Sequence, residues 1–201
     1  EIRSGADRQL VGKGRHVYLS RADQFYGLSV KQISTSAVSE GEEPWELSIS
    51  GQVDRQGLSP AIYQVKGNLP KGLVALKETP IDPSKPSVKK RDGRMPEGLL
   101  DRQSLMYQFM LAPPLSSGGK LWLTDGTAGA LYTYRIAGYE SLAIPTLGEV
   151  QTMKLILSTA GSPEMIELWL IPDNRYLPAK IRHTDAFGAI SEQVVVSLDA
   201  R

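Results

Sequence analysis

The C-terminal half of the sequence constrains the fold most, because it is a row of short apolar segments separated by turn signals. The segments are rich in β-branched and aromatic residues, and pairs such as Asp125-Gly126 and Phe187-Gly188 lie between them. Connections this short join antiparallel neighbours, since parallel strands need long crossovers. The spacing therefore predicts an antiparallel meander whose strands lie at about residues 119–125, 129–138, 149–158, 163–171, 177–185 and 188–198.

One helix is expected before this meander, over residues 101–111. Asp101 is a good N-cap, few helix-breaking residues follow it, and Pro113-Pro114 ends the helix. The apolar residues at helical spacing, which should face the core, are Leu105, Met106, Phe109 and Met110. We therefore expect one amphipathic helix that plugs the curved sheet.

The N-terminal half shows weaker strand signals. Residues 1–15 suggest a flexible entry segment, and residues 16–201 are expected to form a single β-rich, barrel-like domain. Short β-like runs occur at residues 16–19, 26–30, 45–50, 61–65 and 73–76. Residues 79–98 contain four prolines and the run Lys89-Lys90-Arg91, which favours a solvated loop or hairpin tip. The predicted fold class is mainly β, with an antiparallel meander forming a curved sheet or a partly open β-barrel.

Composition excludes several classes of function. The chain of 201 residues has no cysteine and two histidines, which argues against disulfides, thiolate chemistry and a histidine-rich metal site. Its net charge of +1 gives no support to nucleic-acid binding. We expect no cofactor and no metal. No apolar stretch is long enough to span a membrane, so a signal or membrane anchor would lie upstream of this sequence.

Several polar and aromatic residues are candidates for a ligand site. Ser104 and Gln108 lie four residues apart on one helical stripe and could open into a cavity. An aromatic-lined concave sheet could hold an acyl chain or a glycan, although the same rings commonly fill a core or pair across strands. Arg182 could pair with an acidic residue or an anionic ligand. The candidate ligand-binding residues are Ser104, Gln108, Trp122, Tyr134, Trp169, Tyr176 and Arg182.

Catalysis is not expected from these residues. Ser104 has no nucleophile elbow around it, and His183 would serve as its base only if the fold brought the two together. Trp169 alternates with Leu168 and Leu170, so both faces of its strand are apolar; one of them should meet the core, and the other should meet the helix or a partner. We therefore predict a protein that is not an enzyme.

Three stretches carry a family resemblance. Residues 100–108, residues 167–182 with Gly188, and the turn at residues 50–60 resemble, in the expected order, a bacterial domain-of-unknown-function family, number 3108. The resemblance covers roughly residues 45–198. It implies a β-rich, barrel-like fold and an exported protein facing the periplasm, often with a hydrophobic N-terminal segment that would either anchor it to the inner membrane or secrete it. It carries no assigned activity and no catalytic residues.

Two hypotheses of function remain open. The first is a periplasmic domain that binds an apolar or amphipathic envelope molecule, such as a lipid or a lipoprotein acyl chain. The second is an envelope structural or protein-interaction domain without a small ligand. The expected partners are therefore a hydrophobic ligand or an envelope protein, and the sequence leaves the oligomeric state open.

Overall fold

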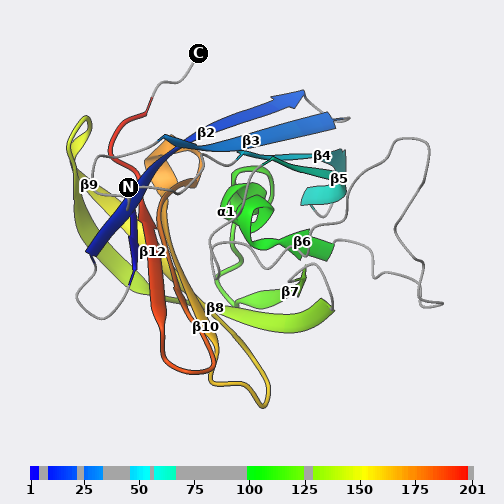
Figure 1. Cartoon of the computed structure of the whole chain (residues 1–201). Coiled ribbons are helices and arrows are strands. Elements are labelled where there is room, and N and C mark those ends of the chain that lie inside the picture. Colours follow the sequence, from blue (N-terminus) through cyan, green and yellow to red (C-terminus); the bar gives the residue numbers. More distant parts are fainter. Residues whose placement is uncertain are drawn as a thin grey trace, which may run out of the picture.

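The computed structural model of the chain describes residues 1–4, 9–21, 25–33, 46–54, 57–66, 99–124 and 129–198. Within these residues twelve strands form one sheet in the order β5-β4-β3-β2-β1-β12-β11-β10-β9-β8-β7-β6. The sheet curls, and helix α1 lies between its β2–β5 half and the strands β6–β8 (Figure 1). The two ends of the sheet, β5 and β6, are not hydrogen-bonded neighbours, so the sheet is not closed. This confirms the predicted curved, partly open β architecture.

The C-terminal meander follows the sequence prediction closely. Its strands are β7 (Gly119–Thr124), β8 (Gly129–Ile144), β9 (Gly148–Thr159), β10 (Met165–Ile171), β11 (Leu177–Thr184) and β12 (Ile190–Val194). Each pairs antiparallel with the next. A register shift at Gly138, whose φ is 145°, lets β8 continue beyond the predicted end at residue 138.

The N-terminal half contributes the other strands. They are β1 (Ile2–Ser4), β2 (Gln9–Arg21), β3 (Phe25–Ile33), β4 (Glu46–Asp54), β5 (Gly57–Lys66) and β6 (Leu99–Asp101). Strand β6 pairs parallel with β7, which the sequence reading did not anticipate; the helix between them provides the crossover that a parallel pair needs. The predicted strand at residues 73–76 and loop at residues 79–98 lie outside the described residues.

The entry segment differs from its prediction. We expected residues 1–15 to be a flexible entry, whereas residues 2–4 form β1 and residues 9–15 belong to β2. Strand β1 lies between β2 and β12 and pairs antiparallel with both. Backbone hydrogen bonds to β2 and β12 hold β1 in the sheet, and such pairing requires no apolar side-chain pattern. The division into one domain stays a prediction.

The core lies on the concave side of the sheet, against α1. Alternate residues of β7–β11 point to this side and pack together with the helix. The buried residues of this concave cluster are Leu100, Leu105, Met106, Tyr107, Phe109, Leu123, Tyr132, Tyr134, Met153, Leu155, Leu157, Ile166, Leu168, Leu170 and Ile181. Strand alternation alone thus explains which residues of the meander build the core.

Helix α1 (Arg102–Leu111) confirms the predicted helix, and Leu105, Met106 and Phe109 are buried as expected. Residues 103–109 are all buried, however, so the helix has no solvent-exposed polar face in its middle turns. This corrects the amphipathic helix that we expected. The reason is that α1 contacts β5 from one half of the sheet as well as β11 from the other. No helix among the described residues is long and apolar enough to cross a membrane.

Candidate functional site

The concave side of the sheet brings together four of the predicted ligand-binding residues. Ser104 and Gln108 are 0% and 3% exposed on α1, and Tyr134 is buried in the concave cluster. The Tyr134 ring meets Phe109 edge-on with 5.3 Å between centroids, and its hydroxyl accepts a hydrogen bond from the Leu115 amide at 3.2 Å. Tyr176 is partly buried and packs against the same cluster. These residues therefore share the interior between sheet and helix.

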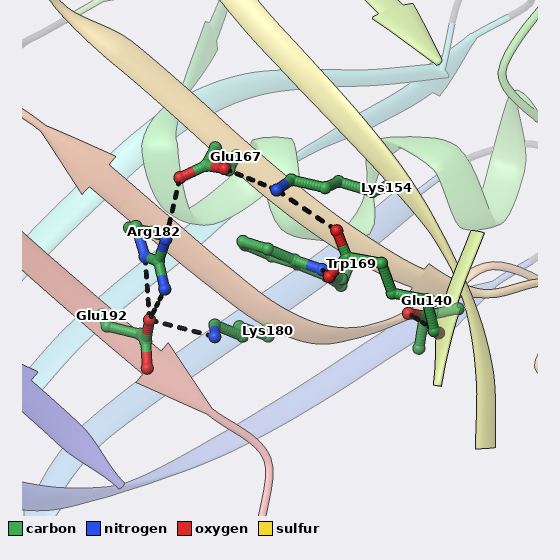
Figure 2. A network of polar contacts seen from close by, with 8 residues as sticks. Glu140, Lys154, Glu167, Trp169, Lys180, Arg182 and Glu192 are labelled. Carbon is green, nitrogen blue, oxygen red and sulfur yellow. Dashed lines mark hydrogen bonds and ion pairs between the residues drawn. The ribbon is translucent and has the colours of Figure 1, made fainter. Parts of the chain in front are cut away.

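Trp169 and Arg182 lie on the opposite face of the sheet. Leu168 and Leu170 point into the concave cluster, and Trp169 between them lies on the opposite face of the strand, as the alternation predicted. Trp169 is nevertheless only 2% exposed. Polar side chains from β8 to β12 cover its ring (Figure 2). We call this set the Trp169 cluster, and its members are Glu140, Lys154, Glu167, Trp169, Lys180, Arg182 and Glu192.

Cations surround the indole ring. The Nζ atoms of Lys154 and Lys180 lie 4.7 Å and 4.6 Å from its centroid, and the Arg182 guanidinium carbon lies 5.5 Å away. Lys154 and Lys180 are the direct neighbours of Trp169 on β9 and β11, so the sheet register places one cation on each side of the ring. Cation–π attraction and the apolar stems of the long side chains together bury the ring.

Carboxylates hold each of these cations. Glu167 pairs with Lys154 at 2.8 Å and with Arg182 at 3.3 Å. Glu192 pairs with Arg182 at 2.9 Å and with Lys180 at 3.1 Å. Lys154 also lies 3.4 Å from Glu140. The cluster has three cations and three carboxylates, so its formal charge is balanced.

Hydrogen bonds and ion pairs within the Trp169 cluster shift the pKa values of three of its members. The hydrogen bond from Trp169 is the largest effect on Glu140 and holds its pKa below the usual value. Burial would raise the pKa of Glu192, but hydrogen bonds from Lys180 and Arg182 outweigh burial and lower it. Burial opposes the charge of Lys154, yet its carboxylate partners raise its pKa. These groups therefore stay ionised near neutral pH, and their balanced charge leaves no uncompensated cation for an anionic ligand.

Trp122 stands apart from both groups. It is 36% exposed on the outer side of β7, directly opposite Leu131 of β8, which is 38% exposed. The predicted site residues are therefore divided: Ser104, Gln108, Tyr134 and Tyr176 lie toward the interior, whereas Trp122, Trp169 and Arg182 lie on the outer face. The structure does not unite them in one pocket.

A second polar group was missed by sequence reasoning. Arg102, the first residue of α1, forms an ion pair with Glu164 in the β9–β10 connection. His183 of β11 contacts the same oxygen, Glu164 Oε1, through Nε2 at 2.6 Å, and its Nδ1 lies 3.4 Å from Arg102 Nη1. Burial raises the pKa of the neighbouring Tyr132 to about 12, with the Glu164 charge adding to the effect. The three elements are distant in sequence, so no local motif signals this group.

Ser104 and His183, the pair that the sequence raised for catalysis, are both buried. The Ser104 side chain is fully buried, and the described contacts of His183 are with Arg102 and Glu164. In the described part of the chain, no group of three or more histidine, cysteine or acidic residues is placed to hold a metal ion. The geometry supplies an apolar interior around a helix and a charge-balanced Trp169 cluster on the outer face.

A family model matches residues 20–195, and its description is "Protein of unknown function (DUF3108)". The chain belongs to this family. The match extends to residues 20–44, which the sequence resemblance did not reach, and it confirms the family that we suspected. No curated protein and no solved structure matches the chain. Membership of the family assigns no activity.

Proposed function

We propose that this chain is a non-enzymatic periplasmic domain that binds an apolar or amphipathic envelope molecule, such as a lipid or a lipoprotein acyl chain. The observation that carries the proposal is the open, curled sheet whose concave face is apolar and is covered by one short helix. A ligand would bind between α1 and this face. The family resemblance supports the bacterial, periplasmic placement and an anchor upstream of this chain.

Two features support the choice of an apolar ligand. Leu155, Leu157, Leu168 and Leu170 are each 0% exposed and form a continuous aliphatic surface on two adjacent strands, β9 and β10. The helix that covers them has ten residues, too few to be stable by itself, so its position depends on tertiary contacts. Displacing such a helix exposes aliphatic surface that an acyl chain can cover.

The proposal is tested by NMR of leucine methyl groups during addition of lysophosphatidylethanolamine, which carries one acyl chain. We expect shift changes at the inward-facing Leu155, Leu157, Leu168 and Leu170. Leu131 and Leu147, which are 38% and 36% exposed, are the internal controls. Native mass spectrometry of protein purified from an envelope fraction should also show a bound small molecule. Absence of binding, or shifts confined to the exposed leucines, would contradict the proposal.

The absence of enzymatic activity has its own test. Burial of Ser104 on the interior helix leaves it no access to a substrate in the folded state. We expect a fluorophosphonate probe, which labels activated serines, to leave Ser104 unmodified in the folded protein. Labelling at Ser104 would support a hydrolase instead.

One observation favours the second candidate, a protein-interaction domain. Trp122 and Leu131 form an exposed cross-strand apolar pair on the outer side of β7 and β8. Large aromatic residues on a surface are typical anchors of protein interfaces. A photo-crosslinking amino acid at residue 122 should then capture an envelope protein in cells, whereas one at the exposed Ser141 should not. Recovery of monomer alone from both positions would count against this role.

A further inference from the structure

Both histidines of the chain contact the helix that covers the concave face. His183 lies on β11 beside Arg102, at the N-terminal end of α1, and His16 lies on β2 beside Tyr107, in the middle of α1. Each half of the curled sheet thus places one histidine against the helix. Histidine is the side chain whose ordinary pKa allows a charge change between pH 5 and 8.

The contacts of His183 favour its neutral form. Arg102 Nη1 can only donate, so His183 Nδ1 accepts from it and Nε2 carries the proton that is donated to Glu164 Oε1. Burial and the Arg102 charge lower the pKa of His183, although Glu164 and Asp185 oppose them. When His183 gains a second proton, it faces Arg102 as a like charge. The protonated His183 of β11 also forms an ion pair with Glu164. The ion pair between Arg102 of α1 and Glu164 is then no longer needed to compensate the Glu164 charge.

The surroundings of His16 also favour its neutral form. His16 Nδ1 lies 3.0 Å from the Tyr107 hydroxyl, and the Tyr107 ring stacks on Tyr18 with 4.6 Å between centroids and 6° between planes. Burial lowers the pKa of His16 to about 4. Burial also raises the pKa of Tyr107, so Tyr107 stays protonated and neutral. No carboxylate contact among the described residues compensates a charged His16.

We propose that α1 is a pH-sensitive cover, which is held on the sheet while His16 and His183 are neutral and is released when they are protonated. Above the ordinary pKa of histidine, the neutral His16 and His183 stabilise the closed state, in which α1 lies on the sheet. This stabilisation is lost as pH falls and the histidines are protonated. The release itself does not depend on a ligand. Its role, opening the concave face to an apolar molecule, rests on the function proposed above.

The sign follows from linkage between protonation and opening. A histidine with a lowered pKa in the closed state and an ordinary one in the open state binds protons more readily when α1 is released. The shift of His16 alone should favour opening on the order of tenfold between about pH 7.5 and about pH 5. His183 adds to this change in the same direction.

Hydrogen exchange measured by mass spectrometry tests the proposal on the whole chain. Exchange rates are corrected for the intrinsic effect of pH, and the window of about pH 5 to about pH 7.5 avoids most carboxyl titration. We expect the corrected exchange of the α1 amides to increase on the order of tenfold at the acidic end. Amides of β9 and β10 are the internal control and should stay protected, which separates release of the helix from acid unfolding.

Variants decide whether the histidines cause the change. The double variant H16Q/H183Q keeps polar, neutral side chains and should show pH-independent corrected exchange in α1. If the double variant does not fold, each single variant should still show a smaller response than the wild type. A wild type without the acid response, or a variant that keeps the full response, would overturn the proposal. If α1 is released at acidic pH but lysophosphatidylethanolamine binds at neither pH, the pH-sensitive cover stands. Only the proposed ligand-binding function is then refuted.

Discussion

The indole nitrogen of Trp169 donates a hydrogen bond to Glu140 Oε2 at 2.9 Å, which joins β10 to β8 across the intervening strand β9. Lys154 of β9 lies between them, within 4.7 Å of the ring centroid and 3.4 Å of Glu140 Oε1. One aromatic side chain thereby connects three strands on the face that carries no helix. The contacts of Trp169 therefore contribute to holding β8, β9 and β10 together on the outer face.

Replacing Trp169 should destabilise the protein according to what each substitution removes. Trp169→Ala is expected to cost about 3–5 kcal/mol, because it leaves a cavity beneath three cations. Trp169→Phe keeps most of the ring and loses the hydrogen bond to charged Glu140, at a cost of about 2 kcal/mol. Urea denaturation measures both. The control is Trp122→Ala at a partly exposed site, expected to cost less than about 1 kcal/mol; equal losses at the two tryptophans would contradict this account.

Glu192 should make stability depend on acid pH. The pKa of Glu192 is lowered in the folded state, so its contribution is fully present above the ordinary carboxyl value and is lost as pH falls through the folded pKa. Glu192→Gln leaves Lys180 and Arg182 without a shared carboxylate and should cost about 3 kcal/mol at neutral pH. The free energy of unfolding of this variant should also vary less than that of the wild type between about pH 6 and about pH 3. An unchanged pH profile would show that Glu192 is not the titrating group.

Gly118 should tolerate alanine less well than Gly161 does, although both have similar backbone angles. Their φ values are 75° and 77°, which favour glycine at each position. A Cβ atom at Gly118 would lie 2.4 Å from the Tyr134 carbonyl oxygen, whereas one at Gly161 meets nothing within 4 Å. Gly161→Ala should therefore cost about 1 kcal/mol from backbone strain alone, and Gly118→Ala about 3 kcal/mol or more. Thermal denaturation of the two variants gives the comparison, and similar losses would count against the close approach.

The hairpin between β10 and β11 should gain stability from one glycine. Arg175 and Tyr176 follow one another with φ values of 53° and 57°, which is unfavourable for side chains other than glycine. Arg175 is exposed, so Arg175→Gly removes backbone strain without removing core packing, and we expect a gain of about 0.5–1 kcal/mol. Asn174→Gly, one residue earlier, is the matched control and should not stabilise the protein. A loss of stability in Arg175→Gly would contradict the prediction.

Alternation along the strands was enough to predict the C-terminal meander and much of the core. Leu168 and Leu170 face the concave cluster because residues two apart share a face, and turn residues mark where each strand ends. The helix was predicted from its cap, its apolar spacing and the prolines after it. These are local signals, and the structure follows them where chain neighbours are also neighbours in the sheet.

The grouping of site residues could not be predicted from the same signals. Arg182 lies directly opposite Glu167 on one side and Glu192 on the other, and this register depends on pairing between strands, including a shift after Trp169. Local sequence signals do not reveal this register. The sequence suggested that Trp169, Arg182 and Ser104 could share a site, whereas they lie on two faces of the sheet. Burial of α1 on all sides was missed because β5, which covers it, belongs to the distant half of the chain.

The position of β1 has a consequence for how the chain reaches its fold. Ile2 is paired with Gln193 of β12 and with Gly12 of β2. Strand β1 therefore obtains one of its two hydrogen-bonded neighbours from β12, far along the chain. During synthesis the N-terminal strands leave the ribosome long before β12 is made, and β1 then has a free hydrogen-bonding edge. Joining segments so far apart in sequence is also slow. The two halves of the sheet can therefore become continuous only after translation has passed residue 194, and a truncated chain would expose an edge open to aggregation.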